Sequence, residues 1–211
     1  MNGAQALIRT LVDAGVDVCF MNPGTSEMHF VAALDDVPEM RGVLALFEGV
    51  ATGAADGYSR IADKPASVLL HLGPGLGNGL ANLHNARKGH TGVVNIVGDH
   101  ATYHKQYDAQ LESDIETVAR NVSSWIRTSN ETSSLAADAA EAVAVASGPP
   151  AQIATLILPA DVSWTEGAEP AEALPARTPE PVADAVLARI TEVLQGDEPA
   201  ALFVGGRACR A

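Results

Sequence analysis

Short apolar runs alternate with amphipathic stretches along the first 160 or so residues of the chain. The runs are apolar at successive positions rather than at every second one, which is typical of strands covered on both faces. The stretches between them carry apolar residues at helical spacing. This alternation predicts an α/β fold, a doubly wound parallel sheet with helices on both faces. We expect strands at 16–21, 42–47, 66–72, 92–98, 123–128 and 151–159, and helices at 3–14, 26–34, 49–61, 78–88, from about 114, and 131–146.

The pattern changes after residue 164. Residues 165–181 are rich in Pro, Ala and Glu and lack apolar periodicity, so they predict an extended linker. Residues 182–206 return to one helical pattern followed by one strand pattern, PAALFVGG. We therefore expect an N-terminal domain at 1–164, a linker at 165–181 and, at 182–211, the first helix and strand of a second α/β domain. One helix and one strand cannot enclose a core, so we expect the natural polypeptide to continue beyond residue 211.

The composition indicates what builds the core and which kinds of partner the chain is not expected to bind. The chain is 47% hydrophobic but only 4% aromatic, so its core must be built from Ala, Val, Leu and Ile. A net charge of −13 argues against nucleic acid. No run of about 18 apolar residues predicts a membrane span, and the N-terminus lacks the features of a signal peptide. Cys19 and Cys209 lack metal-type spacing, which fits a cytoplasmic protein.

Unusual residues follow four of the expected strands. They are NPGTSE (22–27), Glu48, HLGPGLGNG (71–79) and GDHATYH (98–104). Because the carboxyl ends of parallel strands form the ligand-binding edge of such sheets, we expect these segments to converge there. The glycine-rich segment matches neither G-x-x-x-x-G-K-[ST] nor G-x-G-x-x-G. Its glycines indicate either a tight strand-to-helix turn or close approach of the backbone to a flat ligand.

Three histidines are candidates for chemistry. His100 and His104 are spaced for one helix face, but no H-E-x-x-H pattern or third ligand accompanies them, so we predict no metal site in this chain. His71 closes an otherwise aliphatic strand. It is either a structural core histidine or, if its ring faces the crevice, a proton donor or acceptor. The absence of G-x-S-x-G removes the usual signature of a serine hydrolase.

Glu48 is the most unusual acid in the sequence. It follows an apolar run directly, and no lysine or arginine occurs in the ten residues after it. A carboxylate in apolar surroundings favours the form that is protonated or that shares a proton. Such groups occur preferentially at functional sites, so Glu48 is a candidate functional residue.

Residues 2–164 resemble the N-terminal, pyrimidine-binding domain of thiamine-diphosphate enzymes. Acetolactate synthase and benzoylformate decarboxylase are nearest in pattern. The resemblance is carried, in the family's order, by VDVCFMNPGTSEMHF, LALFEGVATGAADGYSR, KPASVLLHLGPGLGNGLANLHNA and VVNIVGD. Residues 182–206 also resemble the start of the family's middle domain.

The resemblance implies thiamine diphosphate as cofactor and a small 2-oxo acid as substrate. In this family the glutamate at the position of Glu48 hydrogen-bonds N1′ of the aminopyrimidine ring and promotes its imino tautomer, which removes the proton from thiazolium C2. His71 falls at a catalytic histidine of the decarboxylase, and Thr25 at a substrate-contacting serine. The residues implied to bind the cofactor are Pro23, Gly24, Thr25, Glu48 and Asn78, and those implied to contact substrate are Thr25 and His71.

The resemblance also implies what lies outside this chain. The family binds the diphosphate and Mg²⁺ through a G-D-G…N motif on a C-terminal domain, and the motif does not occur in these 211 residues. Its active sites lie between that domain of one subunit and the pyrimidine-binding domain of another. We therefore expect a homodimer or homotetramer when intact and little activity from these residues alone. Whether FAD binds, and whether the chain is a fragment or a split subunit, stay open.

The reaction type is also left with alternatives. His-Leu-Gly-Pro-Gly and Pro-Gly-Thr depart from the usual acetolactate synthase pattern, as does Phe47 before Glu48, and they favour a 2-oxo acid decarboxylase or carboligase. Acetolactate synthase large subunit is the alternative within the enzyme class. A non-catalytic binding or regulatory module that keeps the fold is the alternative of another class.

Overall fold

The computed structural model describes residues 1–175 and 177–209. The chain forms two compact units, Met1–Ala176 and Arg177–Ala211. The first contains the sheet and most of the helices. The second contains helix α8 (Asp184–Gln195) and a 3₁₀ turn, η3 (Gly206–Cys209).

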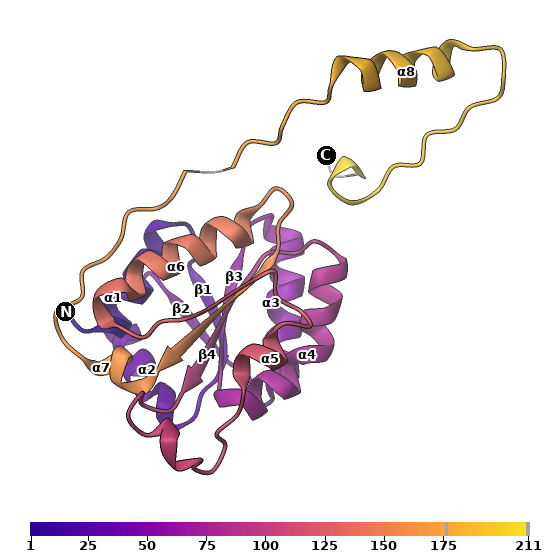
Figure 1. Ribbon diagram of the computed structural model, residues 1–211. Helices are drawn as coiled ribbons and strands as arrows, with labels where there is room; N and C mark the ends of the chain where they lie inside the picture. The colour runs from indigo at the N-terminus through magenta and orange to yellow at the C-terminus, as the bar shows by residue number, and fades with distance from the viewer. Residues whose placement is uncertain (176, 210–211) are drawn as a thin grey trace. The chain divides into compact units, whose positions relative to one another are not determined.

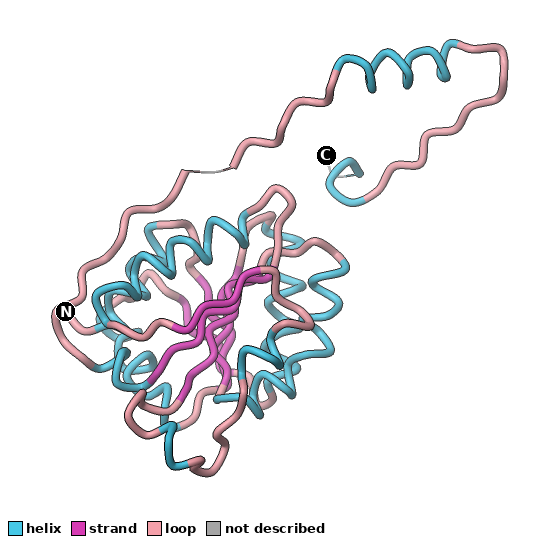
Figure 2. Tube along the Cα trace, viewed as in Figure 1, coloured by secondary structure: helices cyan, strands magenta, loops and turns pink. Residues whose placement is uncertain are grey.

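The first unit is built on six strands that are all parallel, in the order β2-β1-β3-β4-β6-β5. Figure 2 shows these strands gathered between layers of helix. The longest pairing joins β4 and β6 in register from Val93–Ile153 to Asp99–Pro159. The predicted parallel sheet is confirmed. The strands are β1 (Val18–Asn22), β2 (Arg41–Leu44), β3 (Ala66–Leu70), β4 (Val93–Asp99), β5 (Trp125–Thr128) and β6 (Ile153–Pro159).

Helices cover both faces of this sheet, as the strand pattern predicted (Figure 1). Helices α1, α2, α6 and α7 pack on one face, and α3, α4 and α5 pack on the other. Every residue of β3, β4 and β6 is buried, which explains why these runs are apolar at successive positions. The helices are α1 (Gly3–Asp13), α2 (Met28–Asp36), α3 (Glu48–Ala62), α4 (Leu72–Lys88), α5 (Ile115–Ala119), α6 (Thr132–Ser147) and α7 (Ala160–Trp164).

The core follows the composition. Phe30 is fully buried, and the other large side chains that are fully buried are leucines and isoleucines. Alanines fill much of the space between α6 and its neighbours. Small side chains let the helices approach the sheet closely.

Several boundaries differ from the expectation by a few residues, and two of the differences lie at the candidate site. The glycine-rich segment was expected as a loop before a helix at 78–88, but α4 already begins at Leu72. Pro74 is tolerated there because the first turn of a helix has no use for its missing N–H. Strand β2 ends at Leu44 instead of residue 47, so Glu48 is the first residue of α3.

The segment after α7 returns to the start of the chain. The backbone N–H of Gly3 donates to the carbonyl of Thr165 (3.1 Å), and those of Gly167 and Ala168 donate to the carbonyl of Met1 (3.1 and 3.0 Å). Residues 165–168, expected as the start of the linker, are therefore part of the first unit and bond to its N-terminal residues. Beyond them the described residues up to 181 form no helix or strand.

The second unit has its predicted helix but not its predicted strand. None of the residues of α8 is buried. Residues 199–205 form no strand, because a strand needs a hydrogen-bonded neighbour and none is provided for it within the described residues. No helix in the described part of the chain is long and apolar enough to cross a membrane.

Candidate active site

Glu48 occupies the first position of α3, directly after the extended residue Phe47. Only 9% of its surface is exposed. Asn78 of α4 donates a hydrogen bond from Nδ2 to Oε2 of Glu48 (3.1 Å). Within the described residues no lysine, arginine or histidine forms an ion pair with Glu48. The carboxylate is thus buried at a helix N-terminus beside an amide, without a counter-charge.

The first turn of α3 is held to the middle of α4 beside Glu48. Asn82 donates to the carbonyl of Gly49 (2.6 Å), and Thr52 Oγ1 lies 3.1 Å from the carbonyls of both Glu48 and Gly79. A Cβ on Gly75 would lie 3.2 Å from Oε1 of Glu48. A Cβ on Gly79 would lie 2.8 Å from the methyl group of Thr52. Gly75 and Gly79 therefore allow α4 to pack closely on α3, which is a third explanation beside the two that the sequence left open.

A second cluster joins the turn after β1 to the end of β3. Nδ1 of His71 lies 2.8 Å from Oε2 of Glu27, and the backbone N–H of Gly24 donates to the same oxygen (2.7 Å). Gly24 lies directly against the imidazole, since a Cβ there would be 2.3 Å from the ring. The fold therefore fixes the position of the ring from both sides, by a hydrogen bond and by contact.

Glu27 was not singled out from the sequence. Its side chain is fully buried, and Oε1 has no hydrogen-bond partner. Burial raises the pKa of Glu27, and the bonds from Gly24 and His71 oppose this only in part. No local sequence pattern marks Glu27, because the space for its carboxyl is left by Gly98 at the end of β4, where a Cβ would lie 1.7 Å from Oε1 of Glu27.

The contact with Glu27 also selects one protonation pattern for His71. Oε2 of Glu27 accepts from Gly24 and is an acceptor toward the ring, so Nδ1 of a neutral His71 carries the proton. Nε2 is then the atom that can accept a proton. The ring is about one-quarter exposed, so it remains accessible from solvent.

The other candidates fall into separate places. Thr25 is exposed at the start of a 3₁₀ turn, η1 (Thr25–Glu27), and Pro23 is partly buried just before it. The rings of His100 and His104 lie against each other in a tilted arrangement, with 5.5 Å between their centroids. Among the described residues no group of three or more His, Cys, Asp or Glu side chains is placed to hold a metal.

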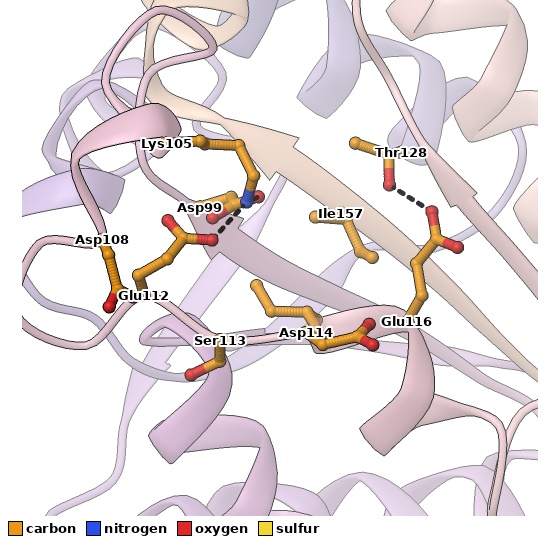
Figure 3. A pocket seen from close by; sticks show the side chains of 10 residues that line it. Asp99, Lys105, Asp108, Glu112, Ser113, Asp114, Glu116, Thr128 and Ile157 are labelled. Atoms are coloured by element: carbon orange, nitrogen blue, oxygen red, sulfur yellow. Dashed lines mark hydrogen bonds and ion pairs between the residues drawn. The ribbon is translucent and has the colours of Figure 1, made fainter.

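A cavity of about 460 Å³ opens at the carboxyl ends of β4, β5 and β6 (Figure 3). This is the edge of the sheet where the sequence placed the site, but neither Glu48 nor His71 lines the cavity. Lys105 reaches between Asp99 and Glu112 in its wall. On the opposite wall Thr128 donates to Glu116 (3.0 Å).

Residues 1–119 match the family described as "Thiamine pyrophosphate enzyme, N-terminal TPP binding domain". The chain belongs to this family. The match spans α1 to α5 and so includes both clusters, the one around Glu48 and the one around His71.

Relatives from the family cover most or all of the chain. "Putative acetolactate synthase large subunit IlvX" of Mycobacterium tuberculosis is 64% identical over 210 residues, which are 100% of this chain and 40% of that protein. Benzoylformate decarboxylase of Pseudomonas aeruginosa is 31% identical over 156 residues, 73% of this chain and 29% of that protein. The chain thus spans two-fifths or less of the length of these relatives.

A solved structure has the same fold. The thiamine diphosphate-dependent 4-hydroxybenzoylformate decarboxylase of Rhodococcus jostii RHA1 superposes with a TM-score of 0.83 at 23% identity, over 92% of this chain and 37% of the other. The predicted resemblance to the N-terminal domain of thiamine-diphosphate enzymes is confirmed.

Proposed function

We propose that this chain is the N-terminal portion of a thiamine-diphosphate-dependent enzyme that decarboxylates a small 2-oxo acid or ligates the product. The observation that carries the proposal is Glu48, which is buried at the start of α3 without a cationic partner. When bound, thiamine diphosphate supplies the electron sink for loss of CO2. The chain's own contribution is to control one proton on the cofactor's ring.

The surroundings of Glu48 fit an aminopyrimidine. Asn78 engages Oε2, so the carboxylate is oriented by a neutral donor that leaves its charge uncompensated. A carboxylate in this state is suited to share a proton with a weakly basic ring nitrogen. We assign Glu48 as the group that holds this proton, and Asn78 as the residue that orients Glu48. Pro23, Gly24 and Thr25 are proposed to border the ring from the turn after β1.

His71 is proposed to exchange a proton with the reacting substrate. Its Nδ1 is engaged by Glu27, and Nε2 is the atom left for proton transfer. Thr25 is exposed at the start of η1, where its hydroxyl would be available to a substrate.

The remainder of the active site is proposed to come from another chain or domain. Leu44, Leu46, Phe47 and Val50 are exposed beside Glu48, an apolar surface suited to a protein partner. We propose that a diphosphate- and Mg²⁺-binding domain of a second subunit covers it in a homodimer or homotetramer. The described residues offer no cluster of their own for the metal. FAD would depend on the domain that begins in the second unit.

The test compares exchange of the C2 proton of bound thiamine diphosphate with deuterium in the intact enzyme and in its E48Q variant. The proposal requires exchange to be abolished while the cofactor still binds, because glutamine cannot take up the proton. E39Q, which changes an exposed acid on the same unit, should exchange normally. Unchanged exchange in E48Q would exclude the assigned role.

Acetolactate synthase large subunit is the second candidate, favoured by the 64% identity to IlvX over the whole chain. Product analysis with pyruvate alone separates the two reactions. Acetolactate indicates ligation of a second pyruvate, and acetaldehyde indicates protonation after decarboxylation. Cofactor binding with no turnover of any 2-oxo acid would instead favour a non-catalytic module.

A further inference from the structure

Three charged side chains form a cluster in the wall of the cavity at the end of β4 (Figure 3). Nζ of Lys105 lies 2.6 Å from Oδ2 of Asp99 and 2.8 Å from Oε1 of Glu112. The side chain of Asp99 is only 3% exposed, and that of Glu112 is 15% exposed. Lys105 lies in a 3₁₀ turn, η2 (Lys105–Tyr107), in the first half of the loop 100–114. Its two ion pairs join this half to Asp99 at the end of β4 and to Glu112 in the second half of the loop.

Each of the two acids in this cluster is adjacent in sequence to a residue near the Glu27–His71 pair. One of these adjacent residues packs on Glu27, and the other packs on α4, the helix that begins after His71. Asp99 follows Gly98, which lies against Oε1 of Glu27. Glu112 precedes Ser113, whose side chain packs directly on Gly73. A Cβ added to Gly73 would lie only 2.3 Å from the Cβ of Ser113. Gly73 is in the first turn of α4, two residues after His71. The cluster is thus connected to Glu27 through one acid and to the helix that His71 caps through the other.

The loop has other attachments: Thr102 donates to Asp161 of α7 from both its backbone N–H and its hydroxyl, and Nε2 of His100 lies 3.1 Å from the carbonyl of Gln110. Lys105 differs from these in reaching Glu112, beside Ser113. Asp108 and Leu111 have left-handed backbone conformations (φ 45° and 72°), which a non-glycine residue keeps only where its surroundings impose them. Partial burial opposes the charge of Lys105, but the bonds to Asp99 and Glu112 outweigh it and raise the pKa of Lys105. The ammonium therefore remains charged and bound to both acids near neutral pH.

We propose that Lys105 is a positioning residue that holds the loop 100–114 against the first turn of α4 and thereby keeps His71 aligned with Glu27. Its relevance to catalysis rests on the proposed function, but the alignment itself is a property of this chain. Without the ammonium, the two carboxylates repel each other and the one on Asp99 is buried without compensation. The part of the loop that carries Glu112 then moves away from Asp99, and Ser113 no longer packs on Gly73.

The test reads the imidazole of His71 directly by ¹⁵N NMR on the full chain, without cofactor, at pH 8. Protonated and bare ring nitrogens give well-separated resonances, which merge when the ring exchanges freely between its two tautomers. His71 is assigned by its loss in H71F. We expect the wild type to give the separated pattern of an Nδ1–H ring, and K105M to lose that separation.

Two variants make the comparison specific. K105R keeps the charge and should restore the separated pattern. K64M is a matched control, because Lys64 also bonds an aspartate, Asp17, at 2.6 Å, and is equally exposed (37% against 38%), but in another ion pair. K64M should leave His71 unchanged.

K105M leaves a buried charge on Asp99, so a double variant, D99N/K105M, removes that charge while still breaking the connection to the loop. We expect it to fold and to lose the separated pattern as well. A role confined to stability would lower the melting temperature of these variants and leave the pattern of His71 intact. That result in either folded variant overturns the proposal, whereas failure of thiamine diphosphate to bind would overturn only the proposed function.

Discussion

Glu27 and His71 meet across the sheet edge, with Oε2 of the carboxyl group 2.8 Å from Nδ1 of the imidazole. The acid comes from the turn after β1, and the ring from the residue that follows β3 and caps α4. Because β1 and β3 are adjacent parallel strands, two residues 44 positions apart are brought into contact. The ring at the candidate site is therefore set by an acid that is itself shielded from solvent.

The first prediction concerns that acid. Glu27→Ala removes the acceptor for both the Gly24 N–H and the His71 ring, so His71 should lose its fixed tautomer in ¹⁵N spectra. The Gly24 N–H left without its acceptor should lower the free energy of unfolding by about 1–3 kcal/mol. Glu39→Ala, at an exposed position, should change neither quantity. A His71 spectrum that survives Glu27→Ala would show that other contacts hold the ring.

The second prediction concerns pH. Burial raises the pKa of Glu27 above its ordinary value of 4.5, so the folded state binds this proton more tightly than the unfolded state. The stability that this group contributes is fully present below pH 4.5 and is lost as pH rises through the raised pKa. Urea unfolding from pH 4 upward should therefore show the wild type losing stability relative to Glu27→Gln. Parallel curves for the two proteins would contradict the raised pKa.

The third prediction compares two glycines. A Cβ at Gly98 would lie 1.7 Å from Oε1 of Glu27, a buried atom on a side chain held by two hydrogen bonds. Gly98→Ala should destabilise the fold by about 1–3 kcal/mol, as overpacking does. Gly57, within α3, has open space around its Cβ position. Gly57→Ala should stabilise the fold by about 0.5–1 kcal/mol, because alanine is the better helix residue.

Thermal or urea unfolding measures both changes. Equal effects from the two substitutions would mean that Glu27 moves aside without cost, and the close contact at Gly98 would then carry no structural meaning.

The fourth prediction concerns the two thiols. Burial raises the pKa of Cys19 to about 12, whereas Cys209 is exposed. At pH 8 a disulfide reagent such as DTNB should titrate one thiol in the folded chain and two in denaturant, since only the thiolate reacts. C209S should titrate none while folded. Rapid reaction of C209S would show that the sheet opens around β1.

The parallel sheet and its two helical layers were predictable because continuous apolar runs have few other uses in a chain of this length. The burial of Glu48 without an ion pair was predictable because the acid follows an apolar run and has no nearby cationic residue after it, whereas its role stays a prediction. Its partner Asn78 came only from the family resemblance, and the hydrogen bond between them appears in the structure. The early start of α4 could not be predicted, because Gly73, Pro74 and Gly75 favour a loop until the packing on Glu48 and Ser113 is known.

Glu27 and Lys105 were missed for a different reason. Both lie in polar segments that have the composition of solvent-exposed loops. Glu27 is buried by residues far along the chain, and Lys105 is bound by an acid on the other side of its loop. Gly98 supports the Glu27 carboxyl from 71 positions away. Local patterns record which residues face a core, but not which acid a distant glycine leaves room for.

Three backbone hydrogen bonds join Met1–Gly3 to residues 165–168, so two segments of the first unit that are far apart in sequence lie in contact. A short peptide joining residue 168 to residue 1 would connect ends that already touch, and new ends could then be opened in an exposed turn. The strands should therefore form the same sheet even when their order along the chain is changed. Circular permutation of this unit should preserve both clusters, since neither the Glu48 nor the His71 cluster includes a residue of the joined segments.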